Sequence, residues 1–199
     1  MVLAGLITRL RPYVSRLLSI IAKPLAVLPA DFYSFLSLGV LVLYLHASVS
    51  HQYPRALFFF GLSALLDAVD GAVARLRGEA GPRGGYVDSL VDRLCDAGYV
   101  AGFILMGLPL WPSYLLLTGS FLVSYSRARY ESFAGRGMEG YGLMERGDRI
   151  IAFTVILVLM VLGRGRLASL VLSIVAALVW FTFIQRLLKG LQDLPRRLK

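Results

Sequence analysis

Cysteine, asparagine and charged side chains are scarce in this 199-residue chain. It contains one cysteine, Cys95, and no asparagine, and charged residues form 17% of the sequence against 57% for hydrophobic ones. A single thiol excludes an internal disulfide, and with it a small secreted scaffold held by such bonds, so we interpret Cys95 as a buried, unreactive thiol. The low charge excludes an ordinary water-soluble domain of this size. The lack of heat-labile asparagine favours a thermophilic source.

The hydrophobic residues gather in six segments, each suited to one membrane crossing of about 20 residues. The predicted crossings are 32–49, 56–75, 86–108, 113–125, 150–162 and 167–187. Before them, residues 1–24 alternate leucine and isoleucine with basic residues, which is typical of an amphipathic helix at the membrane surface. We therefore predict an all-α integral membrane protein with six transmembrane helices. Its parts are an N-terminal amphipathic interfacial helix (1–24), a six-helix membrane domain (25–188) and a basic cytoplasmic tail (189–199).

Basic residues outnumber acidic ones by 21 to 12, which gives a formal net charge of +9. With six crossings, the N-terminal helix, the loops 77–85 and 126–149 and the C-terminal tail share one side. The other side holds only Arg55, Arg164 and Arg166 of the 21 basic residues. By the positive-inside rule, both termini then face the cytoplasm, as in a multi-pass protein of the cell membrane. The basic excess thus indicates topology, and we expect no nucleic-acid partner.

Four aspartates interrupt the second and third predicted crossings. Asp67 and Asp70 are three residues apart and Asp88 and Asp92 are four apart, so each pair projects from one face of its helix. Carboxylates inside membrane helices are costly and point to function. Divalent cations relieve their repulsion, and oxygen ligands without a nearby histidine or cysteine pair favour Mg²⁺, Mn²⁺ or Ca²⁺ over zinc. We predict a two-metal Mg²⁺ site on the cytoplasmic side, with Mn²⁺ as an alternative. Asp96 continues the second pair by one turn, and both metal binding and a structural partner, such as Arg93 or a polar neighbour, stay open for it.

Small residues and an arginine follow Asp67 along the same helical stripe. Gly71 and Ala74 leave room for a ligand beside the metals, and Arg75 provides a fixed positive charge suited to phosphate. The glycines between residues 78 and 85 let the chain turn towards the second acidic helix. Taken singly, each residue has a structural explanation, such as capping or close helix packing. The ordered set instead predicts a metal-bound diphosphate at the membrane surface.

This pattern resembles the signature of the CDP-alcohol phosphotransferase family, which reads D-x2-D-G-x2-A-R-x8-G-x3-D-x3-D. Every spacing is kept here, at Asp67, Asp70, Gly71, Ala74, Arg75, Gly84, Asp88 and Asp92. The resemblance covers nearly the whole chain, because the family also has six crossings. It implies a homodimeric membrane enzyme in which two metal ions hold a CDP-linked alcohol while an acceptor hydroxyl displaces CMP. Such chemistry requires no covalent enzyme intermediate.

The resemblance also implies roles for individual residues. The metal ligands are implied to be Asp67, Asp70, Asp88 and Asp92, and Asp92 is implied to be the catalytic general base as well. The residues implied to contact the CDP donor are Asp31, Gly71, Ala74, Arg75 and Gly81. Where the family often has Pro-Asn and a threonine before its first crossing, this chain has Ala30, Asp31 and Ser34.

An arginine-rich region between the fourth and fifth crossings indicates which alcohol accepts the group. Arginine binds phosphate through a two-pronged fork, so Arg127, Arg129 and Arg149 predict an acceptor that itself carries a phosphate. These positions resemble the A-R-A-E-like and E-R-x-x-R segments of the inositol-phosphate-using branch of the family, although Tyr130 departs from that branch. The alternative is that these arginines serve only the positive-inside rule.

The leading hypothesis is Mg²⁺-dependent transfer of a phosphatidyl or archaetidyl group from a CDP-lipid to myo-inositol 1-phosphate, with release of CMP, in phospholipid biosynthesis. Its partners would be the CDP-lipid donor, a phosphorylated polyol and membrane lipid. Two alternatives keep the site: glycerol 3-phosphate as the acceptor, or CDP-inositol as the donor, which would make di-inositol phosphate. A different class of protein, a divalent-cation transporter, is the third, but it would not explain the fixed spacing of Gly71, Ala74, Arg75 and Gly84.

Overall fold

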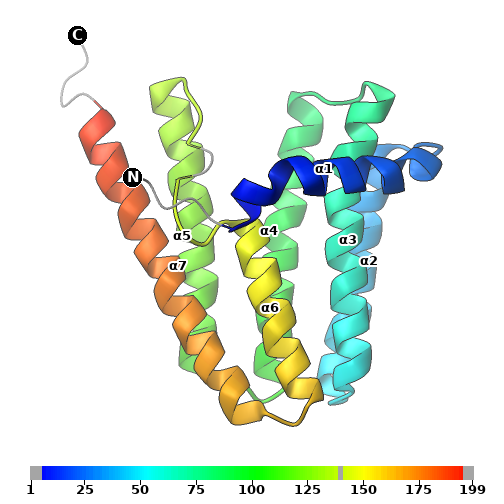
Figure 1. Cartoon of the computed structure of the whole chain (residues 1–199), viewed down its shortest axis with the longest axis vertical. Coiled ribbons are helices and arrows are strands. Elements are labelled where there is room, and N and C mark those ends of the chain that lie inside the picture. The colour runs from blue at the N-terminus through cyan, green and yellow to red at the C-terminus, as the bar shows by residue number, and fades with distance from the viewer. Residues whose placement is uncertain (1–5, 139–140, 195–199) are drawn as a thin grey trace.

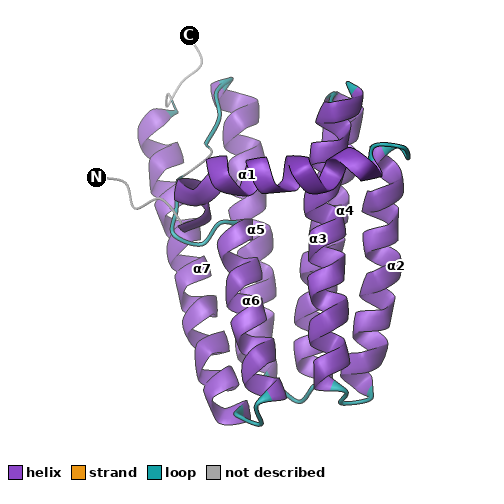
Figure 2. Cartoon of the chain, turned by 45° about the vertical axis from the view of Figure 1, so that its right-hand side comes forward, coloured by secondary structure: helices purple, strands orange, loops and turns teal. Residues whose placement is uncertain are grey.

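The computed structural model describes residues 6–138 and 141–194. Within these residues the chain forms seven helices and no strand (Figures 1 and 2). The helices are α1 (Leu6–Leu25), α2 (Ala30–Val49), α3 (Tyr53–Arg77), α4 (Pro82–Leu105), α5 (Leu110–Ala134), α6 (Arg146–Val161) and α7 (Gly165–Asp193). Helices α2 to α7 stand side by side as a bundle, and α1 lies across one end of it.

Each of the six predicted crossings coincides with one helix from α2 to α7, and the all-helical fold is confirmed. Among the described residues, α2, α3 and α7 are long and apolar enough to cross a membrane. Helix α4 carries several charges in its first half, and α6 has only 16 residues. The count of six crossings therefore stays a prediction.

The helix ends explain how the acidic segments are joined. Helix α3 is followed directly by Gly78, which takes a left-handed conformation (φ 70°) and donates its N–H towards the carbonyl of Arg75. Helix α4 then begins at Pro82, whose missing N–H costs nothing at the first helical position. The chain thus reverses within four residues, and the acidic parts of α3 and α4 lie next to each other.

Two helices extend beyond the predicted crossings. Helix α5 continues from residue 125 to Ala134 and ends at Gly135 (φ 61°), and an ion pair from Arg127 to Glu131 spans one turn of this extension (Nε to Oε1, 2.9 Å). Helix α7 continues through Asp193, so the first part of the predicted tail 189–199 is helical. Residues 1–5 and 195–199, which belong to the predicted interfacial helix and tail, lie outside the described residues.

The end of the bundle away from α1 is closely packed and apolar. Tyr99 and Phe103 of α4 meet Phe60 and Phe153 edge to face. Gly102 is required here, because a Cβ atom at this position would overlap the ring and hydroxyl of Tyr44. Small residues let membrane helices approach in this way. Cys95 is buried nearby, as predicted.

Helix α1 is tied to the bundle through the chain that follows it. The hydroxyl of Tyr33 donates to the carbonyl of Leu25 (2.6 Å), and Arg77 donates to the carbonyl of Ala26 (2.8 Å). Ala22 is fully buried against α3. These contacts fix α1 across the end where α3 finishes and α4 starts.

Candidate active site

Three of the four predicted metal-binding aspartates come together between α3 and α4. Asp67 and Asp70 lie on α3 and Asp88 on α4, and each offers a carboxylate oxygen within 4.8 Å of the others. The two α3 residues are buried, and Asp88 is the least buried of the three. Ser34 of α2 donates to Asp70 Oδ2 (2.5 Å), which orients that carboxylate. The hydroxyl at this position is therefore part of the site.

Asp92 lies outside this group of three and is held by two arginines. Arg146 Nη1 is 2.6 Å from Asp92 Oδ1 and 2.5 Å from Asp67 Oδ2, so it bridges α4 and α3. Arg93 Nη2 is 3.0 Å from Asp92 Oδ2. The sequence analysis did not single out Arg146. The available signal was its place in the E-R-x-x-R segment that begins α6.

Asp96 forms a buried ion pair with Arg149. Arg149 Nη2 donates to Asp96 Oδ2 (2.7 Å), and the two side chains are 1% and 2% exposed. The structure thus gives Asp96 an arginine partner, and the nearest contact comes from Arg149, whereas Arg93 Nε is 4.0 Å away. Arg149, a predicted acceptor ligand, is therefore already committed to a carboxylate.

A cavity of about 630 Å³ opens beside the acidic cluster. Asp88 and Asp92 lie on one wall. The guanidinium-bearing residues along it are Arg93, Arg127, Arg146, Arg149 and Arg186. An anionic ligand that enters this cavity would meet positive charge from α4, α5, α6 and α7.

The predicted acceptor arginines are only partly brought together. Arg127 lines the cavity and pairs with Glu131, but Arg129 does not line it. The Arg129 side chain is exposed, and its guanidinium carbon lies 4.4 Å from the centre of the Phe133 ring. The predicted acceptor role of Arg129 therefore gains no support from its position.

Arg186 is a cavity residue that the sequence analysis counted only for topology. It is buried in α7, donates to the carbonyls of Val123 (2.7 Å) and Tyr141 (2.9 Å), and pairs with Glu145 (3.0 Å). A lone arginine inside a long apolar segment was the signal that could have revealed it, because such a charge inside a membrane helix is rarely neutral to function.

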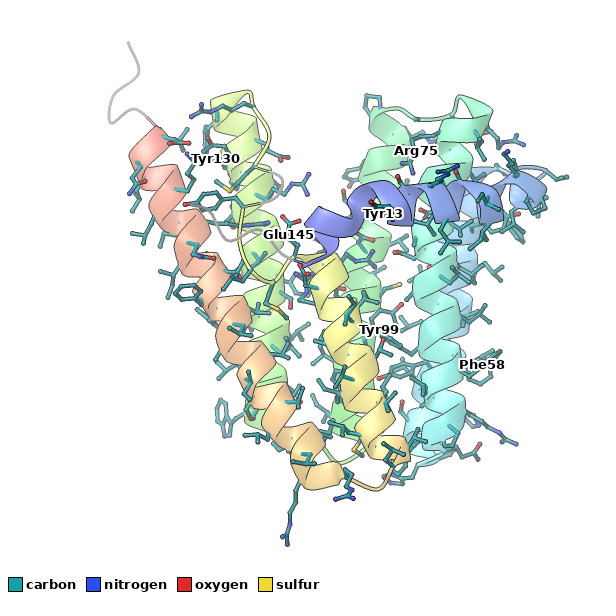
Figure 3. All side chains as sticks on the ribbon, viewed as in Figure 1. Tyr13, Phe58, Arg75, Tyr99, Tyr130 and Glu145 are labelled. Carbon is teal, nitrogen blue, oxygen red and sulfur yellow. The ribbon has the colours of Figure 1, made fainter. Side chains whose placement is uncertain are left out.

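The predicted donor residues gather around the α1 end of the bundle. Of these, Arg75 lines a second hollow of about 340 Å³. The other residues that line it are Ala72, Leu76, Ser15, Arg16 and Ser19. Figure 3 shows Arg75 beside α1 and Glu145 near the same end of the bundle, whereas Tyr99 and Phe58 lie further from that end. Gly71 leaves space beside Arg75, because a Cβ atom there would meet only Arg75 Nη1, at an ordinary contact distance of 3.6 Å.

Of the remaining donor predictions, Ala74 is half-buried on α3, Gly81 precedes α4, and Asp31 lies half-buried in the first turn of α2. The start of α2 is tied to the loop between α3 and α4 by Glu79, which accepts from the backbone N–H of Ala30 (3.2 Å). The hydrogen bond from Arg77 (2.6 Å) and the one from Ala30 lower the pKa of Glu79. These contacts hold Asp31 and Gly81 close to the end of α3.

The charges of the cluster fit a divalent cation. Five aspartates (Asp67, Asp70, Asp88, Asp92 and Asp96) face three arginines (Arg93, Arg146 and Arg149), a formal excess of two negative charges. Within the described residues, Asp67 Oδ1 is buried without a hydrogen-bond partner. A buried carboxylate oxygen without a partner is unusual in proteins, and carboxylate oxygens are the ligands that Mg²⁺ and Mn²⁺ prefer.

An acidic cluster beside an arginine-lined cavity, at one end of an apolar bundle, suits an enzyme that transfers phosphate-bearing groups. Residues 27–185 match the model of the CDP-alcohol phosphatidyltransferase family. The chain therefore belongs to this family and is a phosphotransferase, which confirms the resemblance seen in the sequence.

Two relatives with an assigned activity are similar over most of the chain. The archaetidylinositol phosphate synthase of Pyrococcus horikoshii is 36% identical over 184 residues, which cover 91% of this chain and 94% of the relative. The enzyme of the same description from Aeropyrum pernix is 41% identical over 141 residues, which cover 71% and 72% of the two chains. These relatives support the expected branch of the family.

A solved structure shows the same fold. The Mycobacterium tuberculosis phosphatidylinositol phosphate synthase with CDP-DAG bound superposes with a TM-score of 0.77, at 23% identity, over 92% of this chain and 99% of that one. The same protein has been solved in complex with manganese and citrate. At this identity the likeness establishes the fold.

Proposed function

We propose that this protein transfers a phosphatidyl or archaetidyl group from a CDP-lipid to myo-inositol 1-phosphate and releases CMP. The observation that carries this proposal is the arrangement of the acidic cluster and the arginine-lined cavity, which share Asp88 and meet beside Asp92. A phosphorylated acceptor bound by the arginines would place its hydroxyl next to the carboxylates. The archaetidylinositol phosphate synthases among the relatives support this choice of acceptor.

Asp67, Asp70 and Asp88 are the residues that would hold two divalent cations together with Asp92, the proposed fourth ligand. Mg²⁺ is the proposed metal and Mn²⁺ the alternative, which the manganese complex of the mycobacterial protein supports. When bound, the metal supplies neutralisation of negative charge on the diphosphate and makes CMP a better leaving group.

Asp92 is the proposed general base. Its side chain is 15% exposed and lines the cavity, so an acceptor hydroxyl can reach it. The hydroxyl oxygen would form a bond to the phosphorus of the lipid phosphate, the bond from that phosphorus to the CMP oxygen would break, and the hydroxyl proton would pass to the Asp92 carboxylate. Arg93 holds the other Asp92 oxygen and keeps the carboxylate directed towards the cavity.

The proposed acceptor site combines Arg127 and Arg149, two of the three predicted acceptor arginines, with Arg186. Arg127 and Arg186 carry the acceptor phosphate in this proposal, because both line the cavity. Arg149 also lines the cavity and is held there by its ion pair with Asp96. Arg129, the third predicted acceptor arginine, lies on α5 like Arg127 but does not line the cavity.

The proposed donor site lies at the α1 end and consists of Asp31, Gly71, Ala74, Arg75 and Gly81, of which Arg75 lines the hollow beside α1. We propose that α2 to α7 cross the cell membrane, with α1 in the cytoplasmic interface and both termini in the cytoplasm. Large apolar side chains such as Phe35, Val42 and Leu170 are exposed on the bundle, as lipid-facing residues would be. The family resemblance supports a homodimer.

The test is release of CMP by the purified protein with Mg²⁺. CDP-archaeol and CDP-diacylglycerol would each be offered with myo-inositol 1-phosphate, glycerol 3-phosphate and unphosphorylated myo-inositol. We expect CMP and a phosphorylated inositol lipid with the first acceptor alone. Release of CMP with glycerol 3-phosphate, or from CDP-inositol as donor, would contradict the proposed substrates. No CMP with any pair, together with uptake of metal into vesicles, would favour a transporter.

A further inference from the structure

Arg146 lies where the acidic cluster and the cavity meet. It is the first residue of α6, and its Nη1 atom contacts Asp67 Oδ2 (2.5 Å) and Asp92 Oδ1 (2.6 Å). Its Nε atom is 3.5 Å from Asp96 Oδ1. The same side chain is 24% exposed and lines the cavity. One guanidinium group therefore bridges two of the carboxylates assigned to the metal site.

Arg146 makes fewer hydrogen bonds than the arginine one turn further along α6, although it contacts three aspartates. Arg149 is 1% exposed and donates to Asp96 and to the carbonyl of Met144. Among the described residues, both Nε and Nη2 of Arg146 are buried without a hydrogen-bond partner, whereas only Nε of Arg149 is. A guanidinium has five N–H groups to satisfy, so an arginine that uses one nitrogen is bound mainly by charge. Such a side chain loses few hydrogen bonds when it moves.

A divalent cation held by Asp67 and Asp92 would lie next to the two oxygen atoms that Arg146 contacts. With Arg146 in contact, the cluster has a formal excess of two negative charges, which one dication balances. A second dication at Asp67 and Asp92 would meet a positive charge already bonded to both carboxylates. Two cations at contact distance repel each other strongly in a partly buried site. The second metal ion and the observed position of Arg146 are therefore incompatible.

We propose that Arg146 competes with a divalent cation for Asp67 and Asp92, and that it turns into the cavity when the cation binds. This inference rests on the proposed function only for the position of the metal site. In the cavity, the guanidinium adds to the positive charge of Arg127 and Arg186, so an anion is needed there to stabilise it. An acceptor phosphate is such an anion. Arg146 thus couples the binding of the metal to the binding of the acceptor.

The direct test measures metal binding without substrate. Mn²⁺ would be titrated into the detergent-solubilised protein, and free Mn²⁺ followed by its electron paramagnetic resonance signal. We expect Arg146→Gln to bind the weaker of the Mn²⁺ ions about tenfold more tightly or better, because a competitor and a repulsive charge are both removed. Arg136→Gln removes an equal charge outside the cavity, where Arg136 pairs with Asp193 at the end of α7, and should stay close to the wild type. Unchanged or weaker binding by Arg146→Gln would overturn the inference.

A second variant covers the case in which Arg146→Gln does not fold. Arg146→Ala leaves a space that methylguanidinium fills. We expect added methylguanidinium to weaken Mn²⁺ binding by Arg146→Ala and to leave the wild type unaffected, because the wild type carries its own guanidinium. Equal effects on the two proteins would contradict competition at this position. Arg146→Lys keeps the positive charge on a shorter side chain that lacks the Nε contact to Asp96, so its Mn²⁺ affinity should lie between those of the wild type and Arg146→Ala.

The coupling has its own measurement. Binding free energies are reciprocal, so a phosphate that stabilises the displaced Arg146 must tighten metal binding. We expect inorganic phosphate or myo-inositol 1-phosphate to increase the Mn²⁺ affinity of the wild type several-fold, and this increase to disappear in Arg146→Gln. An equal increase in both proteins would exclude Arg146 as the link. These titrations need no turnover, so failure of the CMP assay would overturn the proposed function and leave this inference standing.

Discussion

The two halves of α4 show opposite kinds of packing. The half near α1 carries Asp88, Asp92 and Asp96 in an ionic cluster with buried oxygen atoms that lack hydrogen-bond partners among the described residues. The other half packs Gly102 against the Tyr44 ring and Phe103 against the Phe153 ring. The apolar half is fully packed without a ligand, whereas the acidic half leaves polar atoms for a ligand to satisfy. Changes in the first half should therefore act on catalysis and metal binding, and changes in the second on stability.

Loss of a central carboxylate should have the largest effect. Asp67→Asn removes one oxygen ligand next to Asp70 and Asp88 and releases Arg146 from α3. We expect the rate of CMP release to fall by about a thousandfold, because the metal provides most of the charge neutralisation in this type of transfer. Asp193→Asn is a matched control, since Asp193 pairs with Lys189 at the end of α7 outside the site. A modest loss for Asp67→Asn would argue against a metal at this cluster.

Asp96→Asn tests a residue that belongs to the acidic half but is occupied by an arginine. The change leaves the Arg149 guanidinium buried without its carboxylate. Removal of one partner of a buried ion pair typically destabilises a protein by about 3–5 kcal/mol. We expect a large drop in melting temperature that Mn²⁺ does not restore. Restoration by Mn²⁺ would instead indicate that Asp96 is a metal ligand.

Gly102→Ala tests the apolar half. The added methyl group would overlap the Tyr44 ring, whose hydroxyl donates to the carbonyl of Tyr99 (2.8 Å). Overpacking of this kind costs about 1–3 kcal/mol. The melting temperature should fall, while the turnover of the folded fraction should hold. Gly39→Ala is the control, because nothing lies within 4 Å of the added atom there. Equal melting temperatures for the two variants would show that the helices separate easily at Gly102.

The sequence was sufficient for the features that depend on spacing within one helix. The pairs Asp67 with Asp70 and Asp88 with Asp92 fix two acidic faces by helical geometry alone, and the glycines between them allow the close turn. Three of these aspartates do meet. The contacts of Arg146 and Arg186 could not be predicted, because they depend on how α6 and α7 pack against α3, α4 and α5. That packing is set by many apolar contacts spread over the whole bundle.

For Arg127 and Arg129, spacing within the helix and packing between helices each supply part of the answer. Residues two apart on a helix point about 200° away from each other, so helical geometry excludes that both face one cavity. Which of them does so depends on the contact of α5 with its neighbours, and the structure places Arg127 at the cavity and Arg129 on Phe133. The sequence analysis treated the two as equivalent.

The smallest expected effect follows from this difference. Arg127→Ala should raise the KM for myo-inositol 1-phosphate about tenfold and leave the KM for the CDP-lipid nearly unchanged, because one charge-assisted phosphate contact is lost. Arg129→Ala should change either constant by less than about twofold, since an exposed cation–π contact contributes little to the site. Initial rates of CMP release at varied concentrations of each substrate would measure both. If Arg129→Ala raised the acceptor KM as much as Arg127→Ala, the acceptor phosphate would have to bind on the outer face of α5 instead of inside the cavity. Arg146 lines the cavity, so it would then lie too far from the phosphate to respond to it.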